Sequence, residues 1–316
     1  MTRPLIFLFP GQSSQDPEMI DRLDAVKPGL GAKVRGQIQS RLSGAEPGSN
    51  LSLQLRVTAC NLAYLELAGQ HGLIASASAG MSLGEYSHLV HIGAIEAEAC
   101  LDLIAARGRA YDSGPAGKMV ALQPVVRSEL EALTARVQSG LGGTEALVEI
   151  SNVNSPSQCV IAGEAEAVET LSALAEQELA AIPKPIEDRL PMHCARFRPV
   201  AEALRPALEA APWRPPRGVY WPNVLGVPQP EPRREVLVEL LYAHVYRRVE
   251  WAKTIDGLLA AHPGALLVEV GPRRNLAAVL GRRWHPEARC LSLDQMEDAS
   301  PSAFAARVQE ILDAAR

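Results

Sequence analysis

The sequence predicts an α/β fold with a mostly parallel sheet, into which a smaller subdomain is inserted. Short apolar runs alternate with long segments whose apolar residues recur at helical spacing. The run at 5–9, LIFLF, is apolar without interruption, which is typical of a parallel strand buried on both faces. Between 118 and 188 the pattern changes to short strands and helices in the order β-α-β-β-α-β, which is the ferredoxin-like arrangement.

The first large segment begins with the strand at 5–9, which ends in a turn at 10–15 where the chain leaves the sheet. Residues 16–50 are rich in Gly, Pro and Arg and contain helices whose limits the pattern does not define. The elements expected after these are a helix at 51–70, a strand at 73–78, a helix that begins at about 86, and a helix at 94–111.

Two further sets of elements complete the chain. The insertion is expected to contain strands at 119–122, 146–153, 158–162 and 181–185 and helices at 128–138 and 164–179. After it we expect helices at 193–208, 235–246 and 251–261, strands at 218–221, 266–270 and near 289–293, a helix to 283, and a closing helix. A proline at 206 is expected to kink the first of these helices. The large domain is therefore predicted at 1–117 and 189–316, and the subdomain at 118–188.

Composition narrows the class of protein. The chain has 316 residues, 47% hydrophobic and 21% charged, as in an ordinary globular protein. Its net charge of −5 gives no basic footprint for nucleic acid, and it has neither an apolar run of membrane-spanning length nor a signal peptide at its start. The five cysteines are scattered without a Cys-x-x-Cys pair, which argues against zinc and for reduced thiols. We therefore expect a cytoplasmic protein that binds neither membrane nor nucleic acid.

Ser82 stands between Gly80 and Gly84, where a predicted strand meets a predicted helix. This spacing is the nucleophile-elbow pattern, in which a side chain at either glycine would strike the neighbouring backbone. The serine hydroxyl is then exposed at the carboxyl end of the strand. The N–H of Leu83, at a helix N-terminus, can stabilise a developing oxyanion. The pentapeptide alone is equally compatible with a tight turn and an incidental serine.

A serine nucleophile needs a base. Among the seven histidines, His193 and His244 are nearly tied on physical grounds. His193 directly follows the insertion and a rigid proline, at the predicted start of a helix, so its side chain can face a cleft between two domains. His88 and His91 lie three apart, as a metal-binding pair could, but no acidic third ligand has a fitting spacing, and we expect packing or solvent roles for them.

Six segments carry a resemblance that covers nearly the whole chain. They are FPGQSSQ at 9–15, GMSLGEY at 80–86, RG at 107–108, NSPSQCVIAG at 154–163, PMHCA at 191–195 and EVGP at 269–272. Together they resemble the malonyl-CoA:acyl carrier protein acyltransferase family, which includes the acyltransferase domains of polyketide synthases. The resemblance implies an α/β-hydrolase-like large domain with a ferredoxin-like subdomain, an active site in the cleft between them, and a two-step ping-pong transfer.

The resemblance also implies roles for individual residues. Ser82 matches the nucleophile and His193 the base. The backbone N–H groups of Gln12 and Leu83 match the oxyanion hole. Arg107 matches an arginine that pairs with the free carboxylate of a malonyl group, a task that suits a planar guanidinium because it can bind both carboxylate oxygens.

Other matched positions surround the acyl group and depart from the family pattern. Gln54 matches a glutamine that lines the acyl pocket, and His244 replaces the usual glutamine whose backbone carbonyl orients the catalytic histidine. Met81 stands where histidine is usual, Tyr111 where methionine is usual, and Met192 where serine or phenylalanine is common. These departures leave the Ser-His chemistry intact but leave the identity of the acyl group open.

The implied function is transfer of an acyl group, most simply malonyl because of Arg107, from CoA to the phosphopantetheine thiol of an acyl carrier protein in fatty acid or polyketide biosynthesis. The CoA thioester and phosphopantetheine are substrates, and no metal or permanently bound cofactor is expected. The enzyme is expected to be a freestanding monomer. Alternatives are an acyl-carrier-protein hydrolase, a transferase of a non-malonyl acyl unit in polyketide biosynthesis, and a non-catalytic docking module, which the presence of Ser82 and His193 argues against.

Carrier proteins of this class are acidic, whereas the enzyme itself carries a net charge of −5. Long-range attraction is therefore absent, and local arginines must steer the carrier. The candidates are Arg196, Arg198, Arg273 and Arg274.

Overall fold

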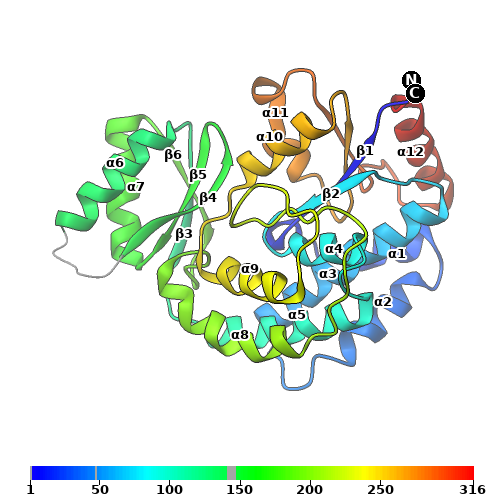
Figure 1. Cartoon of the computed structure of the whole chain (residues 1–316), viewed down its shortest axis with the longest axis horizontal. Coiled ribbons are helices and arrows are strands. Elements are labelled where there is room, and N and C mark those ends of the chain that lie inside the picture. The colour runs from blue at the N-terminus through cyan, green and yellow to red at the C-terminus, as the bar shows by residue number, and fades with distance from the viewer. Residues whose placement is uncertain (1, 47, 141–146) are drawn as a thin grey trace.

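The computed structural model describes residues 2–46, 48–140 and 147–316 and contains two separate sheets (Figure 1). The first sheet is parallel, in the order β2-β1-β7-β8, and consists of β1 (Leu5–Phe9), β2 (Ala77–Gly80), β7 (Leu266–Glu269) and β8 (Arg289–Ser292). The second is antiparallel, in the order β4-β5-β3-β6, and consists of β3 (Lys118–Gln123), β4 (Val148–Ser155), β5 (Gln158–Gly163) and β6 (Ile182–Glu187). The predicted fold class is confirmed.

Strand β1 lies inside the parallel sheet, and its alternate side chains enter two different cores. Phe7 and Phe9 join the larger core, and Ile6 and Leu8 join the core on the opposite face. The helices that contribute to the larger core are α1 (Met19–Val26), α2 (Leu30–Gln39), α3 (Asn50–Gln70), α4 (Gly84–His91), α5 (Ala97–Asp112), α8 (Arg198–Ala210), α9 (Arg234–Tyr246) and α12 (Pro301–Ala314). Those of the opposite face are α10 (Trp251–Ala261) and α11 (Leu276–Trp284). The uninterrupted apolar run of β1 follows from this three-layer arrangement.

The antiparallel sheet forms a subdomain of its own, at the left of Figure 1. Helices α6 (Arg127–Gly140) and α7 (Ala165–Leu179) cover one face and bury a core around Leu130 and Leu171. On the opposite face, Met119 packs against Met192 and Cys194, the two neighbours of His193. The subdomain sheet therefore supports the segment that carries the candidate base. Its strands span 118–187; the domain limits themselves stay a prediction, and residue 146 of the strand predicted at 146–153 lies outside the described residues.

The helix predicted from His193 onward is wrong at its start. His193 has a left-handed backbone with φ of 62°, which a right-handed helix cannot include. A short 3₁₀ turn, η2 (Ala195–Phe197), comes first, and α8 begins only at Arg198. From there α8 runs through Pro206 to its end.

Two strand predictions also need correction. Strand β2 begins at Ala77 rather than at 73, because its pairing with β1 starts there and Ile74 is exposed. The strand predicted at 218–221 reduces to a single bridge between Tyr220 and Gln229. In both regions apolar side chains lie next to the sheet or core without regular pairing, which the apolar pattern alone cannot distinguish from a strand.

The two ends of the chain lie side by side (Figure 1), where the Arg3 N–H donates to the Ala315 carbonyl at 2.6 Å. The five cysteines are free thiols, four of them buried. Within the described ranges, no helix combines the length and the apolar character needed to cross a bilayer, and no group of three or more His, Cys, Asp or Glu side chains is placed to hold a metal ion.

Candidate active site

Ser82 lies in the sharp turn between β2 and α4, with a left-handed backbone at φ of 50°. A Cβ atom on Gly80 would lie 1.9 Å from the carbonyl oxygen of Gly84, and a Cβ on Gly84 would lie 2.1 Å from the carbonyl oxygen of Phe9. Neither contact is physically possible, so strand and helix can approach this closely only with glycine at both positions. This is the turn that the glycine spacing predicted.

The turn brings Ser82 to His193, which is 111 positions away in the chain. The Ser82 hydroxyl lies 2.8 Å from Nε2 of His193, and Nδ1 of the same ring lies 2.7 Å from the backbone carbonyl oxygen of His244. A carbonyl can only accept a hydrogen bond, so the proton of a neutral imidazole resides on Nδ1 and Nε2 is free to accept from the hydroxyl. A serine paired with a base of fixed tautomer is an arrangement for nucleophilic attack.

His193 is nearly fully buried, and this sets its protonation. Burial, with a smaller contribution from the nearby charge of Arg107, lowers the pKa of His193 to about 4 against the opposing effect of its hydrogen bond to His244. The imidazole is therefore neutral at pH 7 and can take a proton.

Asn223 holds the turn from behind. Its Oδ1 accepts from the Ser82 N–H at 2.7 Å, and its Nδ2 donates to the Gly80 carbonyl at 2.7 Å, so one buried side chain bridges both sides of the elbow. Sequence reasoning missed Asn223, which lies 141 positions from Ser82. The only local signal is a Pro-Asn pair after Tyr220 and Trp221, which indicates a turn and nothing about its partner.

Glu85, in the first turn of α4, is fully buried below this site. Its Oε1 accepts from the Tyr220 hydroxyl, and its Oε2 accepts from the Asn223 N–H at 3.2 Å and lies 3.5 Å from Nδ1 of His244. Burial raises the pKa of Glu85 to about 8 in spite of these hydrogen bonds, so the carboxyl keeps its proton at neutral pH.

The His244 ring stacks on the His193 ring with 4.9 Å between their centroids and 26° between their planes. Burial lowers the pKa of His244 well below its usual value, so the ring is neutral. Its backbone carbonyl lies where the resemblance placed it, against the candidate base.

Arg107 projects from α5 into the protein interior and is 1% exposed. Its Nη2 donates to the Tyr111 hydroxyl at 2.6 Å, and its guanidinium carbon lies 4.0 Å from the centroid of the Tyr111 ring and 5.5 Å from that of Tyr86. Among the described residues, Nε and Nη1 have no hydrogen-bond partner. Unpaired buried N–H groups on a cation are costly, and an anionic group at this position would satisfy them.

Three further residues predicted to bind substrate are buried or half-buried. Gln54 is buried in α3 and donates to the Gln12 side chain at 3.4 Å, while its own Oε1 has no partner in the described part of the chain. Met81 is half-buried against the core of α10 and α11. Met192 is half-buried between the large core and the subdomain sheet.

The two predicted oxyanion donors begin helical turns that adjoin each other. Gln12 opens the 3₁₀ turn η1 (Gln12–Ser14) directly after β1, and Leu83 precedes α4. The first N–H groups of a helix lack an intrahelical partner, and neither of these two donates to a backbone carbonyl of the described residues. A Cβ on Gly11 would lie 3.6 Å from Cβ of Ser82 and 3.7 Å from the Leu83 nitrogen, so the loop before Gln12 contacts the elbow.

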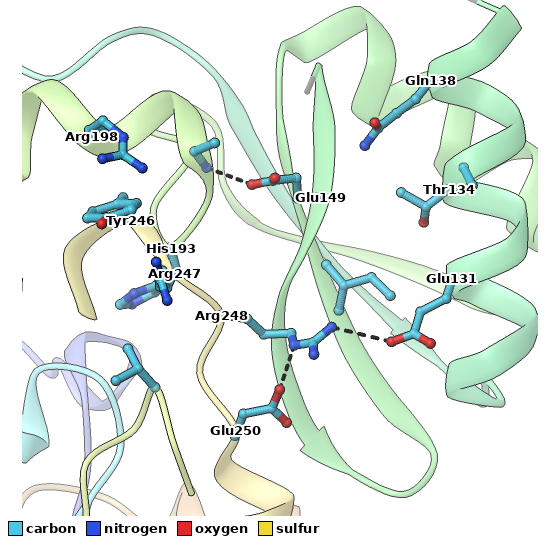
Figure 2. Close-up of a pocket in the computed structure, with 14 residues that line it drawn as sticks. Glu131, Thr134, Gln138, Glu149, His193, Arg198, Tyr246, Arg247, Arg248 and Glu250 are labelled. Atoms are coloured by element: carbon cyan, nitrogen blue, oxygen red, sulfur yellow. Dashed lines mark hydrogen bonds and ion pairs between the residues drawn. The ribbon is translucent and has the colours of Figure 1, made fainter. Parts of the chain in front are cut away.

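A cleft of about 610 Å³ opens beside His193, between α6 and β4 of the subdomain and the segment after α9 (Figure 2). On one side of it Arg198 and Arg247 flank Tyr246, with guanidinium carbons 4.3 and 5.8 Å from the ring centroid. Across the cleft, Arg248 bridges Glu131 at 3.3 Å and Glu250 at 2.7 Å. The cleft thus presents paired charges on its subdomain side and exposed arginines near the candidate base.

His88 is buried and His91 is half-buried, and both pack as expected. Nδ1 of His88 and Nδ1 of His91 lie 2.7 and 2.8 Å from the Ser78 hydroxyl, and Nε2 of His88 accepts from the Trp221 N–H at 3.1 Å. Burial lowers the pKa of His88 to about 3 and that of His91 to about 4, so both are neutral structural groups.

Comparison with known proteins gives a consistent set of similarities, although no protein-family model matches the chain. The malonyl CoA-acyl carrier protein transacylase of Bacillus subtilis (strain 168) is 29% identical over 288 residues, which is 87% of this chain and 89% of the relative. That of Escherichia coli (strain K12) is 28% identical over 287 residues, 87% of this chain and 91% of the relative.

Solved structures of similar fold come from the same kind of protein as these relatives. The crystal structure of FabD from Acinetobacter baumannii superposes with a TM-score of 0.86 at 27% identity, over 99% of this chain and 100% of that one. A type II polyketide synthase malonyl-transacylase, PlMCAT, solved in complex with its acyl-carrier protein AntF, gives a TM-score of 0.85 at 25% identity, over 97% of this chain and 99% of that one.

Proposed function

Because the chain belongs to the malonyl-CoA:acyl carrier protein transacylase family, we propose that it moves a malonyl group from coenzyme A to the phosphopantetheine thiol of an acyl carrier protein. The CoA thioester and the phosphopantetheine arm are its substrates, and no bound cofactor takes part. One observation carries the proposal. Ser82 and His193 lie 2.8 Å apart in a site that also holds a buried guanidinium with two unpaired nitrogens.

In the first half-reaction, Oγ of Ser82 attacks the thioester carbonyl carbon while Nε2 of His193 takes its proton. The resulting oxyanion faces the N–H groups of Gln12 and Leu83; one such donor is typically worth about 3 kcal/mol of barrier. The intermediate collapses by breaking the C–S bond, and the CoA thiolate leaves with the proton from His193. The product is an acyl ester on Ser82.

The second half-reaction runs through the same groups in the opposite sense. The thiol of the carrier arm gives its proton to Nε2 of His193 and attacks the ester carbonyl. The C–O bond to Ser82 breaks, and the serine oxygen regains the proton. Burial supports the use of His193 in both steps, because a neutral imidazole is required at the start of each.

The charge of Arg107 supports malonyl as the acyl group. A malonyl carboxylate can accept from Nε or from Nη1, the two nitrogens without a partner in the described protein, and its second oxygen can accept from the other N–H of Nη2. A neutral acyl group would leave both donors dry in a buried site.

The positive charges in the cleft suit an anionic pantetheine arm or an acidic carrier protein. Arg198 and Arg247 line it next to His193 on the Tyr246 side, so we place the phosphate of the pantetheine arm or acidic carrier side chains there. Of the other arginines predicted to steer the carrier, Arg196 is ion-paired with Glu164 and Arg273 with Asp16 at 3.2 Å. These two are less available to a partner.

A second candidate, transfer of a non-malonyl acyl unit, is favoured by one contact. The Tyr111 hydroxyl already occupies Nη2 of Arg107, and two tyrosine rings lie against the guanidinium. Intact-mass analysis after mixing with malonyl-, methylmalonyl- and acetyl-CoA distinguishes the two. A malonyl adduct on Ser82 that a carrier thiol removes faster than water does is expected. An adduct only with a neutral acyl thioester would overturn the malonyl assignment.

A further inference from the structure

A connected set of buried polar groups lies beneath the candidate dyad. It begins at the elbow, where Asn223 bonds the Ser82 N–H and the Gly80 carbonyl, each at 2.7 Å. The backbone N–H of Asn223 in turn donates to Oε2 of Glu85 at 3.2 Å. The position of the serine therefore depends on Glu85 through a single intermediate residue.

The same carboxyl lies beside the support of the base. Oε2 of Glu85 lies 3.5 Å from Nδ1 of His244, a contact without a hydrogen bond in the described structure, and the backbone carbonyl of His244 orients His193. The other oxygen, Oε1, accepts from the Tyr220 hydroxyl, which fixes the rotation of the carboxyl. Glu85 is fully buried, so bulk solvent does not reach it to replace these partners.

Building on the proposed function, we propose that Glu85 is a positioning residue that holds Ser82 at its distance from His193, because it bonds Asn223, the residue that fixes the elbow. The geometry requires such a group. Ser82 and His193 both have left-handed backbones, at φ of 50° and 62°, and non-glycine residues hold such conformations only when their surroundings determine them. The two residues come from segments 111 positions apart, so their distance depends on the buried groups that hold each segment in place.

Glu269 offers a matched comparison within the chain. Like Glu85, it is a fully buried carboxyl. It accepts from the backbone N–H groups of Asn275, Leu276 and Ala277 at 2.9, 2.9 and 3.0 Å. All three belong to the start of α11 rather than to the elbow or the loop after α9. Replacing Glu269 by glutamine tests the loss of a buried carboxyl without touching the dyad.

The experiment compares Glu85→Gln, Asn223→Ala and Glu269→Gln in the full-length protein. The two carboxyl oxygens accept from Tyr220 and Asn223, whereas a glutamine amide has only one accepting oxygen. Glu85→Gln therefore loses one of these two hydrogen bonds. We expect the rate of Ser82 acylation at saturating malonyl-CoA to fall about tenfold to a hundredfold in the first two variants, since a shift of about 1 Å costs this much. KM should stay within about twofold. Glu269→Gln should lower the melting temperature and keep the acylation rate per folded molecule.

A second readout is the labelling rate of Ser82 with a fluorophosphonate, which needs the dyad but no acyl recognition. Wild-type acylation and labelling rates in Glu85→Gln would overturn the inference, as would an equal loss in Glu269→Gln. If no acyl-CoA acylates the wild-type protein, the proposed function fails, and fluorophosphonate labelling still decides the role of Glu85. If Glu85→Gln does not fold, Tyr220→Phe decides. A fall of at least about threefold in labelling is expected for the loss of one hydrogen bond, and an unchanged rate contradicts the proposal.

Discussion

The backbone carbonyl of His244 accepts a hydrogen bond from Nδ1 of His193 at 2.7 Å, and this contact determines that Nε2 is the nitrogen that faces the Ser82 hydroxyl at 2.8 Å. Orientation by a backbone group is independent of the side chain that carries it. A histidine at position 244 can therefore serve where the family usually has glutamine.

Ser82→Ala should abolish the acyl-enzyme. The hydroxyl is the group in hydrogen-bond contact with the candidate base, and alanine retains the backbone of the turn. Intact-mass measurement after incubation with malonyl-CoA checks this, with wild-type protein as the positive control. A covalent acyl adduct that persists in the variant would show that the nucleophile has been wrongly assigned.

His193→Ala should lower the acylation rate by about 10²–10⁴-fold, the usual contribution of a general base. His244→Ala should cost less, because the carbonyl that bonds His193 belongs to the backbone and remains. Single-turnover acylation by malonyl-CoA measures both variants under the same conditions. The opposite order, with His244→Ala the more damaging, would mean that the two roles are exchanged.

Arg107→Ala should reduce malonyl transfer at least about a hundredfold, because a buried carboxylate would lose its partner at a cost of several kcal/mol. Acetyl transfer should change little. Tyr111→Phe is the matched control, since it frees Nη2 of the guanidinium and keeps the ring against it. Rates with malonyl-CoA and acetyl-CoA are compared for all three proteins. Equal losses of malonyl and acetyl transfer in Arg107→Ala would show that Arg107 does not select the acyl group.

Stability should fall as the pH is lowered from about 6.5 to 4.5. Burial lowers the pKa of His88 to about 3 and those of His91 and His193 to about 4, whereas the unfolded chain binds these protons near pH 6.5. The unfolded state thus takes up more protons in this window, and acid favours it. Glu85 and Glu269, whose pKa values burial raises, act in the opposite sense but are outnumbered.

Calorimetry between pH 4.5 and 8.5 measures this dependence. We expect the melting temperature to be highest near pH 6.5 and to decrease above it as well. Between pH 6.5 and 8 the folded protein keeps the proton on Glu85, whose folded pKa is about 8, whereas the unfolded chain has already released it, so a rising pH favours unfolding. A melting temperature that rises steadily on acidification would contradict the neutral state of the buried histidines.

Charge reversal at Arg198 and Arg247 should raise KM for the carrier protein several-fold and weaken the rise of KM with salt, because the attraction that salt screens is removed. Both side chains are exposed in the cleft beside His193, and local charge governs the encounter with an acidic partner. Arg273→Glu is the control, because Arg273 is paired with Asp16. Steady-state kinetics with holo-carrier as the varied substrate checks this. No change in KM for Arg198→Glu with Arg247→Glu would exclude this side of the cleft as the docking surface.

Much of the fold could be predicted from local sequence, because it depends on which positions are apolar and on which positions have no room for a side chain. The run of β1 is apolar at every position because helices cover both faces of its sheet. Gly80 and Gly84 mark the elbow because no Cβ fits at either position. The change of pattern at 118 identified the ferredoxin-like insertion before any contact was known.

The partners of buried polar groups were decided by the tertiary structure. From the residues alone His193 and His244 are nearly tied as the base and the resemblance separates them, whereas the contacts of Asn223 and Glu85 have no local signal and only the tertiary structure shows them. The helix predicted from His193 is wrong at its start because the backbone of His193 is left-handed. The His193 N–H donates to the Val245 carbonyl at 3.2 Å instead. Spacing along a chain determines which face of an element is apolar. The partner of a buried polar atom is determined only when distant segments meet, since water is then removed and one geometry satisfies each donor and acceptor.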